Sequence, residues 1–262
     1  MEQICDDLEA EHAALDCEVE RLSEEQWDTP TPAEGWSVRD QVSHLWFFDL
    51  KALLALNHPD EFVADAVALM SEGGGGTEAS VRPGREITGE AMMTQWRDDR
   101  ASLLAAARAK DPSARIPWYG PAMGARSFLT ARLMETWAHG QDVADALHVD
   151  REATHRLRHV AHIGVRARPF SYANRGMTMP EVEIHVALEA PDGGTWAWGD
   201  RAAIDSVRGP ALDFCLVVTQ RRHVADTALD IDGHSAREWM SIAQAFAGPP
   251  SNGRTPGQFT GR

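Results

Sequence analysis

The sequence predicts an α+β protein, in which an antiparallel four-helix bundle is followed by a smaller α+β domain. Apolar residues recur at helical spacing in four long segments of the first 150 residues. After residue 180 the pattern changes to an alternation of polar and apolar residues with period two. We therefore predict a bundle over 1–150, an α+β domain over 151–248 and a Pro/Gly-rich tail over 249–262.

The first two long helices have clear signals in the sequence. Apolar residues at helical spacing predict a helix over about 3–22. Ser37, with Asp40 three residues later, forms a capping box that opens the second helix. This helix is predicted to end near Asn57, because Pro59 disfavours helix in the residue before it. It is apolar on nearly every side, which indicates a position inside the bundle.

Two more long helices complete the predicted bundle. They cover about 88–109 and 125–148, and a shorter helix is predicted over 60–70. The glycine run 73–76 is interpreted as a connector, since the GK[ST] of a phosphate-binding loop does not follow it. A loop rich in proline and glycine is predicted over 111–124.

The second domain opens with a predicted helix over about 151–171. Two strands, 181–189 and 195–198, are joined by a Pro-Asp-Gly-Gly turn and predict a hairpin. The remaining predicted elements are a helix over 210–220, a short strand over 228–231 and a helix over 235–247. Strands gathered beside helices in this way are typical of an α+β domain.

Composition excludes several classes of partner. The formal net charge of −15 opposes binding to nucleic acid or to anionic membranes. No segment approaches the roughly 20 apolar residues that span a bilayer, and the acidic N-terminus lacks the pattern of a signal peptide. Three scattered cysteines predict reduced thiols in a cytoplasmic protein. The oligomeric state leaves no readable pattern.

A candidate metal site involves three residues. Glu135 and His139 are four positions apart, so they share a face of the fourth long helix. His44 lies on the second long helix, away from its main apolar stripe. A carboxylate and two imidazoles suit zinc, and three protein ligands leave one position open for chemistry. The same donors also suit nickel, iron or manganese. Taken alone, the Glu/His spacing is more typical of a surface or core hydrogen-bonded pair.

A second group of histidines is a weaker candidate. His155, His159 and His162 fall on one face of the predicted helix over 151–171. The outer two would be about 10 Å apart at a rise of 1.5 Å per residue, too far to share one ion. Arginines surround them, which predicts a solvated or interface face instead.

The residues 35–45, Gly-Trp-Ser-Val-Arg-Asp-Gln-Val-Ser-His-Leu, resemble a known signature. It is that of the DinB-like metal-binding superfamily, and more narrowly of the mycothiol-dependent maleylpyruvate isomerase N-terminal domain group. The run Glu-Thr-Trp-Ala-His-Gly-Gln-Asp over 135–142 is similar to the same pattern. The resemblance implies that His44, Glu135 and His139 bind the metal and that Asp142 lines or supports the site. It also implies a DinB-like bundle followed by a small sterol-carrier-like domain.

The second domain carries a looser match. Residues 207–214, followed by Arg221 and Arg222, resemble a stretch of the same family. The resemblance implies that one of these arginines, for which we choose Arg221 over Arg222, binds a negative charge on the substrate. The substrate is therefore expected to carry a carboxylate. A surface arginine at a helix end is the alternative interpretation.

The resemblance further implies mycothiol as a thiol cofactor. Zinc favours a thiolate, which is a strong nucleophile at neutral pH. We expect an isomerase or S-transferase that acts on a small electrophile. One alternative is a non-catalytic metal-containing binding or stress protein, with an apolar ligand cavity lined by Trp196 and Trp198. Another is hydrolysis by zinc-bound hydroxide, with Asp142 as general base.

Overall fold

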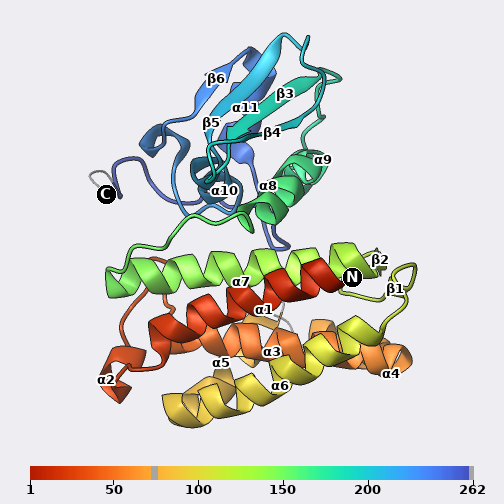
Figure 1. The fold of residues 1–262 in the computed structure, drawn as a ribbon, viewed down its shortest axis with the longest axis vertical. Coiled ribbons are helices and arrows are strands. Elements are labelled where there is room, and N and C mark those ends of the chain that lie inside the picture. Colours follow the sequence, from red (N-terminus) through yellow and green to blue (C-terminus); the bar gives the residue numbers. More distant parts are fainter. Residues whose placement is uncertain (72–75, 260–262) are drawn as a thin grey trace. The chain divides into compact units, whose positions relative to one another are not determined.

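The computed structural model describes residues 1–71 and 76–259. The chain divides into two compact units, Met1–Arg151 and Glu152–Arg262 (Figure 1). Most of the predicted glycine connector, residues 73–75, lies outside the described residues. No helix in the described part of the chain has the length and apolar character needed to cross a bilayer.

Four long helices build the first unit (Figure 1). They are α1 (Glu2–Val19), α3 (Val38–Asn57), α6 (Gly89–Ala109) and α7 (Ala125–Leu147). The helix α3 packs on α6 and α7, and α1 packs on the same two helices. Each was predicted from the apolar spacing to within a few residues. Buried side chains between them form a core that includes Leu15, Val42, Leu45, Met92, Trp96 and Val143.

The start of α3 confirms the predicted capping box. The backbone N–H of Ser37 donates to the Asp40 carboxylate at 3.0 Å, and the backbone N–H of Asp40 donates to Ser37 Oγ at 3.3 Å. The helix ends at Asn57, and its C-cap is His58, directly before Pro59. The reciprocal cap fixes where α3 begins, and therefore which side of the helix carries His44.

Several short elements connect the long helices. They are α2 (Glu24–Trp27), α4 (Pro59–Ser71), α5 (Thr77–Arg85), β1 (Arg115–Ile116) and β2 (Met123–Gly124). Only α4 was predicted. The loop predicted over 111–124 contains the antiparallel pair β1–β2. The helix α2 is a single turn that a second capping box opens, and α5 holds a proline, so neither gives a long apolar repeat.

The helix α5 is held closely against α3 because Gly84 has no side chain. A Cβ atom at Gly84 would lie 2.5 Å from Ser43 Cβ, which is too close for any other residue. Instead, the backbone N–H of Gly84 donates to Ser43 Oγ at 3.0 Å, and Ser43 Oγ donates to the Ser80 carbonyl at 2.8 Å. This contact places Ser80 beside the middle of α3.

The second unit is a four-stranded sheet with helices packed on it (Figure 1). The strand order is β4-β3-β5-β6, with β3 parallel to β5 and the other pairs antiparallel. The strands are β3 (Ile184–Glu189), β4 (Thr195–Trp198), β5 (Asp205–Pro210) and β6 (Asp230–Asp232). The helices are α8 (Leu157–Arg166), α9 (Arg168–Asn174), α10 (Ala211–Val218) and α11 (His234–Ile242), with a 3₁₀ turn at Val224–Asp226.

Two predictions for this unit were wrong. The single helix over 151–171 is two helices, α8 and α9, which are separated at Ala167. Pro169 explains the break, because proline lacks the N–H that would continue the hydrogen-bond ladder. Since α8 begins at Leu157, His155 precedes it, and the three histidines do not share one helix. The strand β5 was also missed.

Candidate metal and thiol site

The three predicted metal ligands come together in the first unit. The imidazole rings of His44 on α3 and His139 on α7 lie 4.6 Å apart between centroids. His139 Nε2 lies 3.5 Å from Glu135 Oε2, one helical turn away. The indole of Trp36 packs against both rings, at 5.1 Å from His44 and 5.9 Å from His139.

The hydrogen bonds around His44 fix its tautomer. The Ser80 hydroxyl donates its single proton to the Thr77 carbonyl at 2.6 Å. At 2.9 Å from His44 Nδ1, the same oxygen therefore acts as an acceptor, and His44 Nδ1 carries a proton. In the neutral ring this places the lone pair on Nε2. Because Ser80 belongs to α5, the docking of α5 on α3 orients His44.

His139 is oriented in the same way by a different chain of hydrogen bonds. The Thr31 hydroxyl donates to the Trp36 carbonyl at 2.9 Å and accepts from Gln41 Nε2 at 3.0 Å. The amide of Gln41 is thereby fixed, and its oxygen faces His139 Nδ1 at 2.5 Å. Nδ1 is again the protonated nitrogen, so the neutral ring has its lone pair on Nε2, the atom beside Glu135.

This arrangement fits a divalent metal in its chemistry. Metal-binding histidines usually donate their second ring N–H to a neighbouring oxygen, as both rings do here. The His139 side chain is 12% exposed and that of Glu135 is 24% exposed, so solvent reaches both. As the side chains stand, however, no three His, Cys, Asp or Glu residues within 1–71 and 76–259 are arranged to hold an ion. Binding therefore requires side-chain movement, and Glu135 is more exposed than His139.

Asp142, the other predicted site residue of this unit, is buried on α7. It is 1% exposed and lies three positions beyond His139 on the helix.

A buried ion pair between α3 and α7 was not predicted. Two of the three side-chain nitrogens of Arg132 on α7, Nε and Nη2, donate to Asp49 Oδ1 on α3 at 3.1 and 2.8 Å. The indole N–H of Trp96 donates to the other carboxylate oxygen at 2.9 Å. Burial alone would raise the pKa of Asp49, but Arg132, His12 and Trp96 together hold it well below its usual range. The pair ties together the two helices that carry the histidines. The available signal was an aspartate directly between two apolar residues, Phe48 and Leu50.

A group of aromatic rings adjoins His44. The ring of Phe48, one turn along α3, lies 4.7 Å from His44. Trp118 and Tyr119, from the loop between β1 and β2, lie 6.3 and 5.7 Å from Phe48. Sequence reasoning missed these residues, because their loop has no periodic pattern.

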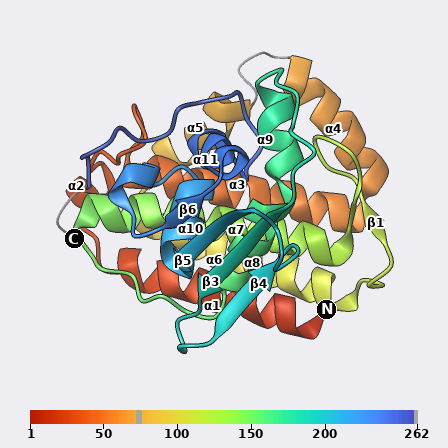
Figure 2. The ribbon, with the colours of Figure 1, turned by 90° about the horizontal axis from the view of Figure 1, so that it is seen from above.

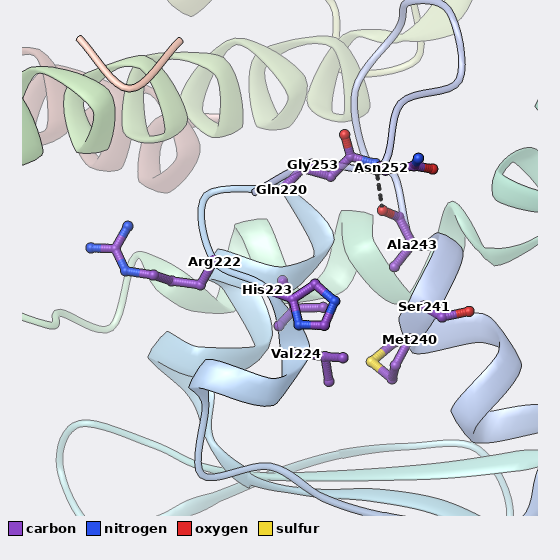
Figure 3. Close-up of a pocket in the computed structure, with 10 residues that line it drawn as sticks. Gln220, Arg222, His223, Val224, Met240, Ser241, Ala243, Asn252 and Gly253 are labelled. Atoms are coloured by element: carbon purple, nitrogen blue, oxygen red, sulfur yellow. Dashed lines mark hydrogen bonds between the residues drawn. The ribbon is translucent and has the colours of Figure 1, made fainter. Parts of the chain in front are cut away.

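The predicted arginines lie in the second unit. Arg221 is 9% exposed, and its NH1 donates to the Thr219 carbonyl at 2.7 Å. Arg222 donates to the Arg221 carbonyl at 2.7 Å, and its guanidinium lies 3.8 Å from the centre of the Phe259 ring. Arg222, but not Arg221, is among the residues that line the small hollow in Figure 3.

That hollow is a shallow depression of about 290 Å³, a volume that includes open solvent. His223, Gln220 and Asn252 give it a polar lining, and Figure 3 shows the guanidinium of Arg222 directed away from His223. Trp196 and Trp198, the predicted walls of an apolar cavity, do not line it. They are half-buried on β4, opposite Leu188 and Val186 of β3.

Comparisons with known proteins agree with the resemblance noted in the sequence. Residues 8–144 match the family described as the mycothiol maleylpyruvate isomerase N-terminal domain. Two relatives are the uncharacterized proteins MT0041 and Rv0036c of Mycobacterium tuberculosis, strains CDC 1551 / Oshkosh and ATCC 25618 / H37Rv. Each is 42% identical over 248 residues, which cover 95% of this chain and 96% of the relative.

Two solved structures share the fold. They are crystal structures of the mycothiol-dependent maleylpyruvate isomerase and of a histidine-to-alanine mutant of it, with TM-scores of 0.57 and 0.58. Both are 14% identical to this chain, and the match covers 84% of this chain and 89% of each structure. At this identity the likeness concerns the fold, a helix-rich α+β architecture. The matched residues include His44, Glu135 and His139, and the chain belongs to the mycothiol maleylpyruvate isomerase N-terminal domain family.

Proposed function

We propose that this chain is a mycothiol-linked isomerase whose reaction site is built around His44, Glu135 and His139. The observation that carries the proposal is the matched orientation of the two histidines. Each ring has its Nδ1 proton bound to an oxygen, from Ser80 or Gln41, so each directs an Nε2 lone pair away from that partner.

The proposal includes a divalent metal, zinc by ligand type, held by His44, Glu135 and His139. When bound, such an ion favours a thiolate over a thiol and so supplies a nucleophile at neutral pH. Glu135 contributes the negative charge of the ligand set. Ser80 and Gln41 hold the His44 and His139 rings in position. The Asp49–Arg132 pair keeps α3 and α7 together.

The proposal also extends to the fold of each unit and to the substrate. We propose that the first unit is a DinB-like four-helix bundle and that the second is a sterol-carrier-like domain. Arg221 is proposed to bind a carboxylate of a small electrophile, with Arg222 as the alternative. Asp142 is proposed to support the site from α7. Arg221 is a buried residue whose guanidinium carries the positive charge that binding of a carboxylate requires.

Turnover of maleylpyruvate in the presence and absence of mycothiol tests the activity. We expect the metal-loaded protein to isomerise the compound only when the thiol is present, without consuming thiol. Net loss of thiol into a stable adduct would instead indicate an S-transferase.

The variant His139→Ala removes a proposed metal ligand. Its rate should fall at least about 100-fold, because the loss of a residue that only orients a ligand already costs up to about 100-fold. His58→Ala, at the exposed end of α3, serves as the matched control. Equal rates with and without thiol would refute the proposal.

A further inference from the structure

The loop between β1 and β2 brings two aromatic residues against Phe48, which packs on His44. Its sequence is Pro117-Trp118-Tyr119-Gly120-Pro121, in which two prolines restrict the backbone. Figures 1 and 2 show this hairpin near α4. Trp118 stacks on Phe62 of α4 with ring centroids 5.3 Å apart, and Tyr119 packs edge-on against the same ring at 5.3 Å.

Within this aromatic group, Tyr119 buries a hydroxyl that makes no hydrogen bond to any described residue. Its ring lies 5.7 Å from Phe48, which in turn lies 4.7 Å from His44. A buried donor without a partner is uncommon, because its lost hydration is not replaced. Burial also raises the pKa of Tyr119, and the charge of Asp65 raises it further, so the phenol remains a donor at neutral pH.

A second buried polar atom without a hydrogen bond lies on the neighbouring helix. Asp65 on α4 binds Lys51 through Oδ1 at 2.7 Å, whereas its Oδ2 has no partner among the described residues. The Asp65 side chain is 34% exposed and that of Lys51 is 18% exposed, so a small molecule can reach this edge of the unit. The two atoms without partners are one donor, on Tyr119, and one acceptor, on Asp65.

One kind of chemical group matches a donor and an acceptor at the same time. A hydroxyl group can accept a hydrogen bond from Tyr119 and donate one to Asp65, whereas a carbonyl can only accept and an ammonium can only donate. We propose that Tyr119 and Asp65 recognise a hydroxyl group of the small molecule that binds beside His44, and that Tyr119 thereby determines specificity. The proposal rests on the proposed function for the identity of that molecule, which is either the thiol or the electrophile.

The chain contains two tyrosines, and the second provides a matched control. The hydroxyl of Tyr172, on α9, donates to Glu238 at 2.9 Å. We expect Tyr119→Phe to leave the melting temperature of the ligand-free protein unchanged or higher, because it removes a polar group that has no partner. Tyr172→Phe should lower the melting temperature, because it removes a formed hydrogen bond. If Tyr119→Phe lowers it instead, an ordered water already satisfies the hydroxyl and the proposal is wrong.

Binding is measured by calorimetric titration of mycothiol, and separately of maleylpyruvate, into the wild type and both variants. Tyr119→Phe should weaken one of the two ligands by roughly two- to tenfold, the range for one hydrogen bond, and leave the other unchanged. The weakened ligand is the one that carries the hydroxyl. Tyr172→Phe should change neither affinity.

The titration is independent of turnover. A wild type that binds either ligand without turning it over would refute the proposed isomerase and keep the recognition site. Unchanged affinity for both ligands in Tyr119→Phe, or no binding of either ligand by the wild type, would refute the recognition site.

Discussion

His44 and His139 face each other across α3 and α7, with ring centroids 4.6 Å apart and with their Nδ1 atoms bound to Ser80 and Gln41. Both oxygen partners act as acceptors, because their own protons or amide groups are already fixed by Thr77 and Thr31. The two rings are thus held in the same tautomer by separate hydrogen-bond chains. This pairing leads to the first two predictions.

Metal content should depend on His44. We expect about one equivalent of zinc per chain in the wild type by elemental analysis, since three protein ligands bind one ion. His44→Ala should retain little metal, while His58→Ala should retain all of it. A wild type that takes up no divalent ion, even when supplied with zinc, would reduce Glu135 and His139 to a hydrogen-bonded pair.

Gln41 should contribute to metal affinity without touching the ion. Gln41→Ala removes the acceptor for His139 Nδ1–H, so the ring loses its fixed orientation. Loss of such an outer-shell partner typically costs about 10- to 100-fold in affinity. Competition with a chelator of known affinity measures the change. Gln26→Ala, which alters the exposed cap of α2, should leave the affinity unchanged.

Acid stability should depend on Asp49. The pKa of Asp49 is lowered in the folded state, relative to about 3.9 in the unfolded chain, because of Arg132, His12 and Trp96. Its contribution to the free energy of unfolding is therefore complete above that unfolded value. It is lost as the pH falls from there toward the folded value.

Urea unfolding of Asp49→Asn checks this prediction. At pH 7 the variant should lose roughly 3–5 kcal/mol, because Arg132 is left buried without its counter-charge. Below about pH 4 the wild type should lose stability more steeply with falling pH than the variant does. Asp60→Asn, at an exposed position of α4, should behave like the wild type. Parallel pH curves for the wild type and Asp49→Asn would contradict the assignment.

One of the three cysteines should react with a thiol reagent in the native protein. Cys17 is exposed, whereas Cys5 and Cys215 are buried. Burial raises the pKa of both buried thiols, which leaves little reactive thiolate at neutral pH. Titration with an aromatic disulfide should release one equivalent of aromatic thiolate per chain in buffer and three equivalents in denaturant. Cys17→Ser should release none in buffer, and rapid reaction of that variant would show that the core opens.

The sequence predicted elements whose signals are local. Ser37 and Asp40 open α3, and Pro59 follows its end, so both boundaries were found within a few residues. The break at Pro169 had an equally local signal that the apolar repeat obscured. The strand β5 had none, because its place in the sheet depends on parallel pairing with β3, some 20 residues earlier in the chain.

The same distinction holds for the site. His44, Glu135 and His139 were proposed from residue type and helical spacing, and the structure brings them together. Ser80 and Gln41 gain their roles only from side-chain hydrogen bonds across elements, which spacing does not reveal. Tyr119 is recognisable only from the missing partner of its hydroxyl, which is a property of the folded chain.

The close contact between Gly84 and Ser43 has a thermodynamic consequence for α5. That contact places Ser80 beside His44, so the ligand-binding form of the histidine exists only while α5 is docked. A ligand that binds only the oriented His44 ring therefore shifts the equilibrium between docked and undocked α5 toward the docked form. At 100 times its Kd such a ligand would add up to about 2.7 kcal/mol to the free energy of local opening. Amide hydrogen exchange in α5 would then report on occupancy of a site to which α5 contributes no ligand.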